Sequence, residues 1–144
     1  FDSVPEGAVV AIEAEARAEA GVLGGIMALR LAKQGAAAVV CDAGMRDVAE
    51  LRALGMPVWC RGAAAASSSA VLMLVEYGRP VALGGVTVMP GDWMVGDADG
   101  VVVCPAALWG AALDEVARRE EAEQPIRVLV EGGAKLRGLY PPKS

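Results

Sequence analysis

The chain has 144 residues, 55% of them hydrophobic, which is enough for one compact domain and short of two. It contains no histidine, and this excludes a Ser-His triad, a histidine-ligated zinc and a phosphohistidine relay. Its net charge of −5 argues against a nucleic-acid-binding surface, because such surfaces are built from clustered Lys and Arg.

The three cysteines, Cys41, Cys60 and Cys104, are far apart and lie among apolar residues. An odd number without paired spacing predicts reduced, buried thiols in a cytoplasmic protein. No run approaches the roughly 18–20 apolar residues of a membrane span, so no membrane contact is expected. The chain begins at Phe1 and shows no signal peptide, and we expect residues upstream of it to be missing.

Strands and helices are predicted to alternate in the first part of the chain. In chain order the sequence predicts a strand at 8–12, a helix at 26–34, a strand at 36–41, a helix at 47–54 and a strand at 57–60. Gly35 and Gly55 stand where glycine commonly ends a helix. Residues 13–20 have helical composition but could equally form a loop. This alternation indicates an α/β layer arrangement.

The pattern changes after residue 61. The Ala- and Ser-rich stretch 62–69 predicts a flexible surface loop. Short strands follow at 80–83, 86–88, 93–95 and 101–103, and their turn-separated spacing indicates a sheet meander or a small barrel. Residues 105–123 predict a long amphipathic helix that Pro125 breaks or kinks, followed by a short helical tail to residue 138.

One group of residues could form a binding or catalytic site. Gly24–Gly25 precede a predicted helix, whose first turn offers free N–H groups and a partial positive charge to an anion. Arg46 follows a strand and can bind a carboxylate through two parallel hydrogen bonds. Asp47 and Glu50 are three residues apart, so on a helix they share a face. Paired carboxylates suit a hard cation such as Mg²⁺, which keeps several waters.

Each of these residues also has a structural interpretation. Gly24–Gly25 could simply permit close packing of the helix on a strand. Asp47 could cap the second helix, with Glu50 completing the capping arrangement. Arg46 would then be an ordinary ion-pair partner. Spacing alone leaves both interpretations open.

Three blocks of sequence resemble the family of RraA-like proteins and 4-hydroxy-4-methyl-2-oxoglutarate aldolases. The first is Gly25, twenty residues, Arg46–Asp47, two residues and Glu50. The second is the run PVALGGVTVMPGD at 80–92, and the third is DADGVVVCP at 97–105. The resemblance extends from about residue 5 to residue 137. Gly25 stands where many aldolases of the family carry an aspartate.

The resemblance implies an RraA-like α/β sandwich of the swivelling-domain kind, with a central mixed sheet or small barrel and a C-terminal helix. One such domain is expected over residues 1–144, without the family's usual N-terminal segment. The family assembles as trimers, sometimes paired into hexamers, with active sites between subunits. We therefore expect a homotrimer or hexamer.

The same resemblance implies roles for individual residues. Arg46 would hold the substrate, and the backbone around Gly24, Gly25, Ile26 and Met27 would cradle its carboxylate. Asp47 would ligate Mg²⁺ or Mn²⁺, and Glu50 would support Asp47 or the waters of the metal. A glutamate of the C-terminal helix, Glu123 or alternatively Glu120, would reach the metal through water from a neighbouring subunit.

The implied activity is that of a divalent-metal-dependent lyase. It would cleave 4-hydroxy-2-oxo acids to pyruvate, and it could decarboxylate oxaloacetate through the same pyruvate enolate. An alternative is a non-catalytic regulator of the same fold that binds a protein partner. Arg46–Asp47 and Glu50 favour the lyase, because the regulator for which the family is named lacks the intact pair. A third alternative is a domain of a larger enzyme.

Overall fold

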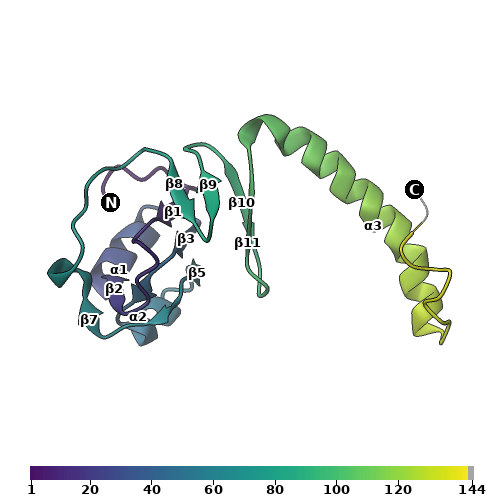
Figure 1. The fold of residues 1–144 in the computed structure, drawn as a ribbon, viewed down its shortest axis with the longest axis horizontal. Helices are drawn as coiled ribbons and strands as arrows, with labels where there is room; N and C mark the ends of the chain where they lie inside the picture. The colour runs from purple at the N-terminus through teal and green to yellow at the C-terminus, as the bar shows by residue number, and fades with distance from the viewer. Residues whose placement is uncertain (143–144) are drawn as a thin grey trace. The chain divides into compact units, whose positions relative to one another are not determined.

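A computed structural model describes residues 1–142 of the chain. They fall into two compact units, one of residues 1–103 and one that begins at Cys104. The first contains two parallel sheets and two helices (Figure 1). The second is dominated by one long helix. The single domain expected over 1–144 stays a prediction.

The first sheet confirms the predicted alternation of strands and helices. It contains β1 (Val9–Ile12), β3 (Ala38–Cys41) and β5 (Val58–Trp59), in the order β1-β3-β5. Both pairings are parallel. These short apolar runs are typical of a parallel sheet, whose two faces are both covered.

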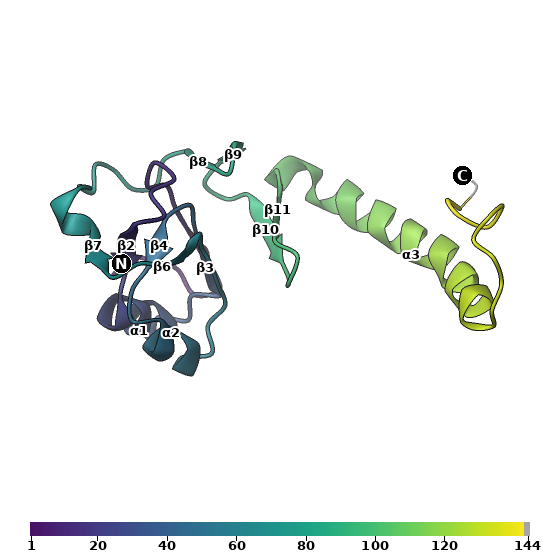
Figure 2. The same ribbon diagram turned by 60° about the horizontal axis from the view of Figure 1, so that its bottom comes forward.

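The second sheet is largely unforeseen in the sequence. It contains β2 (Ala20–Leu23), β4 (Gly44–Met45), β6 (Gly62–Ala63) and β7 (Ala66–Ser67), in the order β6-β4-β2-β7, and all its pairings are parallel. Figure 2 shows these strands together. The prediction of a flexible loop at 62–69 is therefore wrong. Main-chain pairing does not require apolar side chains, and small residues allow strands to approach closely.

Helices α1 (Gly25–Lys33) and α2 (Val48–Ala53) confirm the two predicted helices. Gly35 and Gly55 follow them with φ of 78° and 69°, the left-handed conformation that favours glycine. The helices close a core with the strands, and its largest fully buried side chains are Leu23, Leu31, Met45 and Val39. This core fixes the ends of β2 and β4, after which the predicted site residues follow.

The predicted strands after residue 80 are present, but they form two separate pairs instead of one meander. Strand β8 (Val81–Leu83) pairs antiparallel with β9 (Val86–Val88). Strand β10 (Trp93–Gly96) pairs with β11 (Val101–Cys104). Within the described residues each of these strands pairs with only one other strand, and β8 is also tied to the residue after β1, because the N–H of Ala82 donates to Oε2 of Glu13 at 2.8 Å.

The second unit begins with a 3-10 turn, Ala106–Leu108, and continues as α3 (Trp109–Glu131). Pro125 lies inside α3, so of the two predicted outcomes, a break or a kink, the break is wrong. Proline removes one N–H donor, and the remaining hydrogen bonds on either side sustain the helix. No residue of α3 is buried, so the face predicted to be apolar is not packed against the rest of the described chain. The predicted helical tail after Pro125 is present but ends at Glu131 instead of residue 138.

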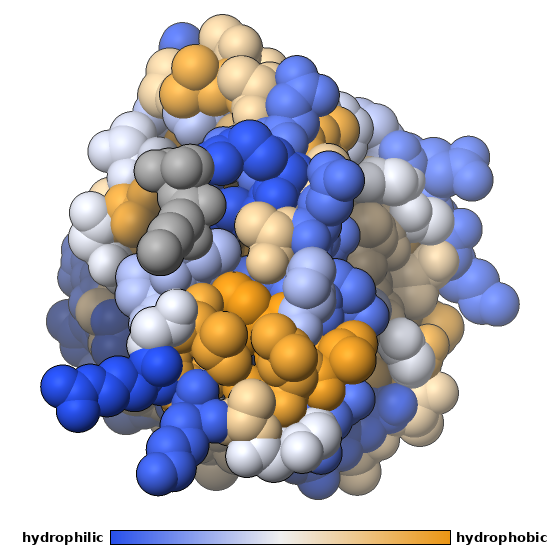
Figure 3. All heavy atoms as spheres, turned by 90° about the vertical axis from the view of Figure 1, so that its right-hand side faces the viewer, coloured by the Kyte–Doolittle hydropathy of each residue, from blue (hydrophilic) through white to orange (hydrophobic). Residues whose placement is uncertain are grey.

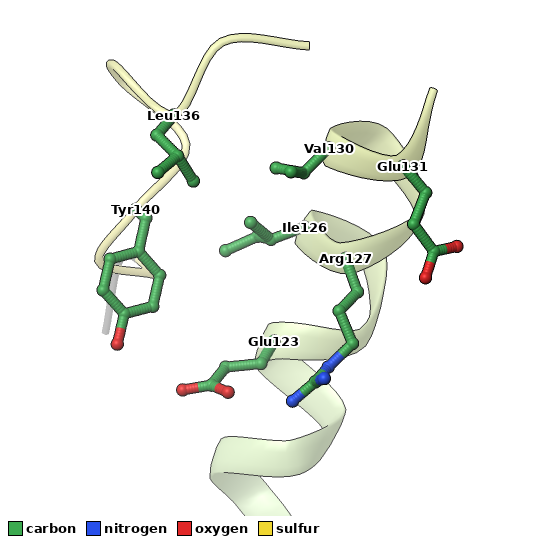
Figure 4. A pocket seen from close by; sticks show the side chains of 7 residues that line it. All are labelled: Glu123, Ile126, Arg127, Val130, Glu131, Leu136 and Tyr140. Atoms are coloured by element: carbon green, nitrogen blue, oxygen red, sulfur yellow. The ribbon is translucent and has the colours of Figure 1, made fainter. Parts of the chain in front are cut away.

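The segment after α3 folds back against the end of that helix. Figure 4 shows Ile126 and Val130 of α3 pointing toward Leu136 and Tyr140, with Glu123 below them. Together with Arg127 and Glu131, these residues line an open cavity of about 240 Å³. Figure 3 looks onto this end of the chain and shows apolar side chains gathered in a patch among polar ones.

The cysteines differ from the prediction. All three are free, but only Cys41 is buried, whereas Cys60 is exposed and Cys104 is intermediate. Burial raises the pKa of the Cys41 thiol to about 11. Cys60 follows the last residue of β5, and its sulfur donates toward the carbonyl of Gly62 at 3.6 Å. In residues 1–142 no helix has the length and apolar character needed to cross a membrane.

Candidate active site

The candidate site lies where β2 and β4 end. These neighbouring parallel strands pair Leu23 with Met45, so both end at the same edge of the sheet. Ligand sites commonly lie beyond the carboxyl ends of parallel strands. Gly24–Gly25 follow β2 and Arg46–Asp47 follow β4, and the N–H of Arg46 donates to the carbonyl of Leu23 at 2.9 Å. The structure thus brings together two predicted site segments that are distant in sequence.

Asp47 connects the two segments directly. Its carboxylate Oδ2 accepts the N–H of Gly25 at 2.9 Å, at the first residue of α1. Asp47 also precedes α2 with φ 53°, a left-handed conformation that Asp tolerates better than most residues. Its side chain makes no capping hydrogen bond to α2. The interpretation of Asp47 and Glu50 as a cap on their own helix is therefore wrong.

Glu50 occupies the space left by the missing side chain of Gly25. A Cβ built on Gly25 would collide with the carboxylate oxygen Oε2 of Glu50. Gly25 has no positive φ, so its lack of a side chain matters here for space and not for backbone conformation. The carboxylates of Asp47 and Glu50 therefore both lie at the start of α1, where the helix dipole favours negative charge.

Arg46 lies beside these carboxylates and against glycine. A Cβ on Gly21 would collide with Cγ of Arg46, and one on Gly24 would lie 3.4 Å from Nη2. Arg46 is half-buried, and its Nε is a buried donor that has no hydrogen-bond partner within residues 1–142. Buried donors in proteins are nearly always paired, so this guanidinium is suited to an acceptor from outside the chain.

The first turn of α1 adds main-chain donors. The N–H groups of Ile26 and Met27 lie in this turn, where an α-helix has no intrahelical acceptor. Ile26 is 86% exposed, whereas Met27 is half-buried and packs against the core. The turn is thus anchored by Met27 and open at Ile26. This arrangement could receive an anion, as the sequence predicts.

The two glutamates predicted to reach the metal lie on α3, in the second unit. Glu123 is half-buried and lines the cavity shown in Figure 4. Glu120 is exposed and, with Glu123, lines a second open cavity of about 430 Å³. In residues 1–142 no three acidic or cysteine side chains form a group that could hold a metal ion. The role of Glu120 or Glu123 stays a prediction.

Sequence analysis missed two glycines that shape this site. Gly21 leaves room for the stem of Arg46, and Gly44 has the carbonyl oxygen of Ala18 and the Cβ of Ala64 each 2.5 Å from where its own Cβ would stand. Both lie in short strands, where glycine often marks a close approach of other groups. That signal was available, but it required recognising residues 20–23 as a strand.

The chain matches the model of a known protein family. The RraA-like model, described as Aldolase/RraA, matches residues 1–103. The chain belongs to the RraA-like family. A relative from Halalkalibacterium halodurans, named "Putative 4-hydroxy-4-methyl-2-oxoglutarate aldolase", is 34% identical over 122 residues, which are 84% of this chain and 57% of that protein.

Solved structures of RraA-like proteins confirm the expected fold class. An uncharacterized protein from Pseudomonas syringae matches with a TM-score of 0.91 and 28% identity, over 96% of this chain and 65% of that one. Streptomyces coelicolor RraAS2, described as an unusual member of the RNase ES inhibitor RraA family, matches with a TM-score of 0.83 and 35% identity, over 87% and 64%. The chain thus spans less than two thirds of these relatives.

Proposed function

We propose that this RraA-like chain carries the site of a divalent-metal-dependent lyase that releases pyruvate from 4-hydroxy-2-oxo acids. The same site would decarboxylate oxaloacetate. The observation that carries the proposal is the buried, unpartnered Nε of Arg46 beside a carboxylate, Asp47, that caps the start of α1. Family membership and the names of two relatives as "Putative 4-hydroxy-4-methyl-2-oxoglutarate aldolase" support it.

Arg46 is the residue suited to hold the substrate. A 2-oxo acid presents a planar carboxylate, which a guanidinium binds through two parallel hydrogen bonds. The stem of Arg46 is confined over Gly21, so its position is set before any ligand arrives. The free N–H groups of Ile26 and Met27 would complete the binding of the carboxylate.

The charges of the site argue for a bound cation. Arg46 contributes one positive charge, whereas Asp47 and Glu50 contribute two negative ones. An anionic substrate would therefore meet net repulsion unless a cation joined it. Two carboxylates suffice for Mg²⁺ or Mn²⁺, because Mg²⁺ typically takes one or two carboxylates and fills its other positions with water and substrate oxygens.

Asp47 and Glu50 would hold that cation, with Glu123 or Glu120 of a neighbouring copy acting through water in a homotrimer or hexamer. A divalent cation would withdraw electrons from the 2-oxo group of the substrate. The complete absence of buried residues in α3 supports an assembly in which another copy covers that helix.

Both reactions break the same bond of the substrate. In the retro-aldol reaction the C3–C4 bond breaks, the 4-hydroxyl loses its proton and becomes a carbonyl, and the bond electrons remain on the three-carbon fragment as the enolate of pyruvate. In oxaloacetate the C3–C4 bond breaks with release of CO₂ and leaves the same enolate. Protonation at C3 then yields pyruvate. The guanidinium of Arg46 would stabilise the negative charge in both cases.

Pyruvate release tests the proposal. We would measure it from oxaloacetate and from 4-hydroxy-4-methyl-2-oxoglutarate, with Mg²⁺ and with EDTA. Arg46→Ala and Asp47→Ala should each lower kcat/KM by about 100-fold or more, because each removes charge-assisted contacts. Arg52→Ala, which removes an exposed arginine of α2, is the matched control and should retain activity.

If neither substrate yields pyruvate, the result would favour the alternative function, a regulator that binds a protein partner. Its support is the likeness to Streptomyces RraAS2, described as belonging to a family of RNase ES inhibitors. A further support is an exposed apolar segment in which Met73, Leu74 and Val75 are 82%, 81% and 85% exposed. Absence of pyruvate release from both substrates with the metal present would sink the lyase proposal.

A further inference from the structure

The chain crosses from the first sheet to the second three times, and two of these crossings lead to the candidate site. The first crossing, residues 13–19, joins β1 to β2 and leads on to Gly24–Gly25. The second, residues 42–43, joins β3 to β4 and leads on to Arg46–Asp47. Because β1 pairs with β3 and β2 pairs with β4, the two crossings run side by side. Their relative position therefore sets how the two halves of the site meet.

The first crossing has an unfavourable backbone conformation. Glu15 and Ala16 both have left-handed φ, 54° and 57°, although neither is glycine. L-residues disfavour this region because Cβ approaches the following carbonyl oxygen. Two such residues in succession persist only where surrounding contacts hold them. The crossing thus depends on an external restraint.

Asp42, the first residue of the second crossing, supplies that restraint. Its Oδ1 accepts the N–H of Ala14 at 2.6 Å, and its Oδ2 accepts the N–H of Ala16 at 3.0 Å. Both oxygens of one half-buried carboxylate are therefore used on the first crossing. The N–H of Gly44, the first residue of β4, also donates to the carbonyl of Arg17 at 3.2 Å, so a third hydrogen bond ties the first crossing to the end of the second.

We propose that Asp42 is a positioning residue for the site: its carboxylate holds the crossing before β2 against the crossing before β4, and so sets Gly24–Gly25 against Arg46–Asp47. Asp42 itself does not touch the substrate. Its kinetic effect rests on the proposed function, whereas its effect on the hydrogen bond between Gly25 and Asp47 does not. An asparagine would keep one acceptor oxygen and place an NH₂ group against the second N–H.

The experiment compares Asp42→Asn with Asp97→Asn. Asp97 is a matched control because its Oδ1 also accepts two main-chain N–H groups, those of Asp99 and Gly100, but within its own turn. At a temperature well below unfolding, Asp42→Asn should lower kcat by about 10- to 100-fold, the loss expected for a misplacement of about 1 Å, with a smaller change in KM. Asp97→Asn should leave kcat unchanged.

A readout independent of activity is the amide resonance of Gly25 in a ¹⁵N-resolved NMR spectrum, since that N–H donates to Asp47. It should move in Asp42→Asn and stay in place in Asp97→Asn. If Asp42→Asn does not fold, Asp42→Glu serves instead, because it keeps both acceptor oxygens one methylene farther out. The Gly25 resonance should move in that variant too.

A folded Asp42 variant with the wild-type Gly25 resonance would overturn the proposal, and so would one with wild-type kcat in an active enzyme. If the wild-type protein releases no pyruvate, the proposed function fails by itself, and the Gly25 resonance still decides the role of Asp42. A purely stabilising role would lower the unfolding temperature and leave both readouts of the folded protein unchanged.

Discussion

The two units of the chain bury their apolar residues to very different extents. Phe1–Val103 has a core in which Leu23 and Leu31 have no exposed surface, whereas α3 has no buried residue and leaves Val128 59% exposed. A helix gains most of its stability in a protein from packing of an apolar face. The first unit therefore contains its own stabilising contacts. The second needs a covering surface that the single chain does not provide within its described residues.

The largest test of this comparison is a pair of leucine truncations. Leu31→Ala should lower the free energy of unfolding by about 2–5 kcal/mol, because it opens a cavity in a fully buried site. Leu129→Ala, at a position that is 48% exposed on α3, should change it by no more than about 0.5 kcal/mol when the protein is dilute enough to be monomeric. Urea unfolding followed by circular dichroism measures both.

An equal cost for the two truncations would break the comparison. In the monomer it would mean that Leu129 packs within the chain, whereas a cost that appears only at higher protein concentration would support the proposed assembly, in which another copy covers α3. Repeating the measurement across protein concentrations would show this directly, because stability gained from assembly rises with concentration.

A second test compares two glycines within the first unit. In Gly44→Ala the new Cβ meets the carbonyl oxygen of Ala18 at 2.5 Å, and backbone cannot yield easily. Overpacking of this kind costs about 1–3 kcal/mol. In Gly25→Ala the Cβ meets only the side chain of Glu50, which can move aside, so the loss of stability should be smaller.

Gly25→Ala should lose little stability but much of its activity. Displacing Glu50 removes one of the two carboxylates from the start of α1, so metal-dependent pyruvate release should fall while the protein stays folded. Thermal unfolding and the pyruvate assay on the same preparations check this. Full activity in Gly25→Ala would mean that the position of Glu50 over Gly25 has no catalytic importance.

The parts predicted correctly from sequence are those where side-chain pattern and local structure coincide. Helix α1 ends before Gly35, whose left-handed φ of 78° is the conformation that glycine favours and that the sequence predicts at a helix end. Family resemblance placed Arg46 and Asp47 in one site, and the parallel pairing of β2 with β4 brings them to Gly25. Strands β6 and β7 were missed because main-chain pairing leaves no pattern in Ala- and Ser-rich sequence.

Long-range contacts explain the remaining failures. No local pattern in the sequence singles out Asp42, because its partners, Ala14 and Ala16, lie 28 and 26 residues away. Asp47 looked like a cap for its own helix, yet its carboxylate accepts a hydrogen bond from the other helix. Local spacing cannot reveal an acceptor whose donor is fixed by the packing of two sheets.

The smallest expected effect on stability concerns the surface of α3, where Glu115 forms ion pairs with two arginines. Glu115 accepts hydrogen bonds from Arg118 and Arg119, and these hold the pKa of its carboxyl down to about 2 from 4.5. The folded pKa lies below the unfolded one, so this stabilisation is present above about pH 4.5 and is lost as the pH falls toward 2.

Because the pair is exposed, Glu115→Gln should lower the unfolding temperature only slightly at pH 7, and the difference from wild type should vanish near pH 2. Glu121→Gln removes a carboxylate of the same helix that is not the partner of Arg118 or Arg119, so it is the control and should leave the unfolding temperature at pH 7 unchanged. A difference at pH 7 as large as that of Leu31→Ala would mean that charges, and not a missing covering surface, determine the stability of the second unit.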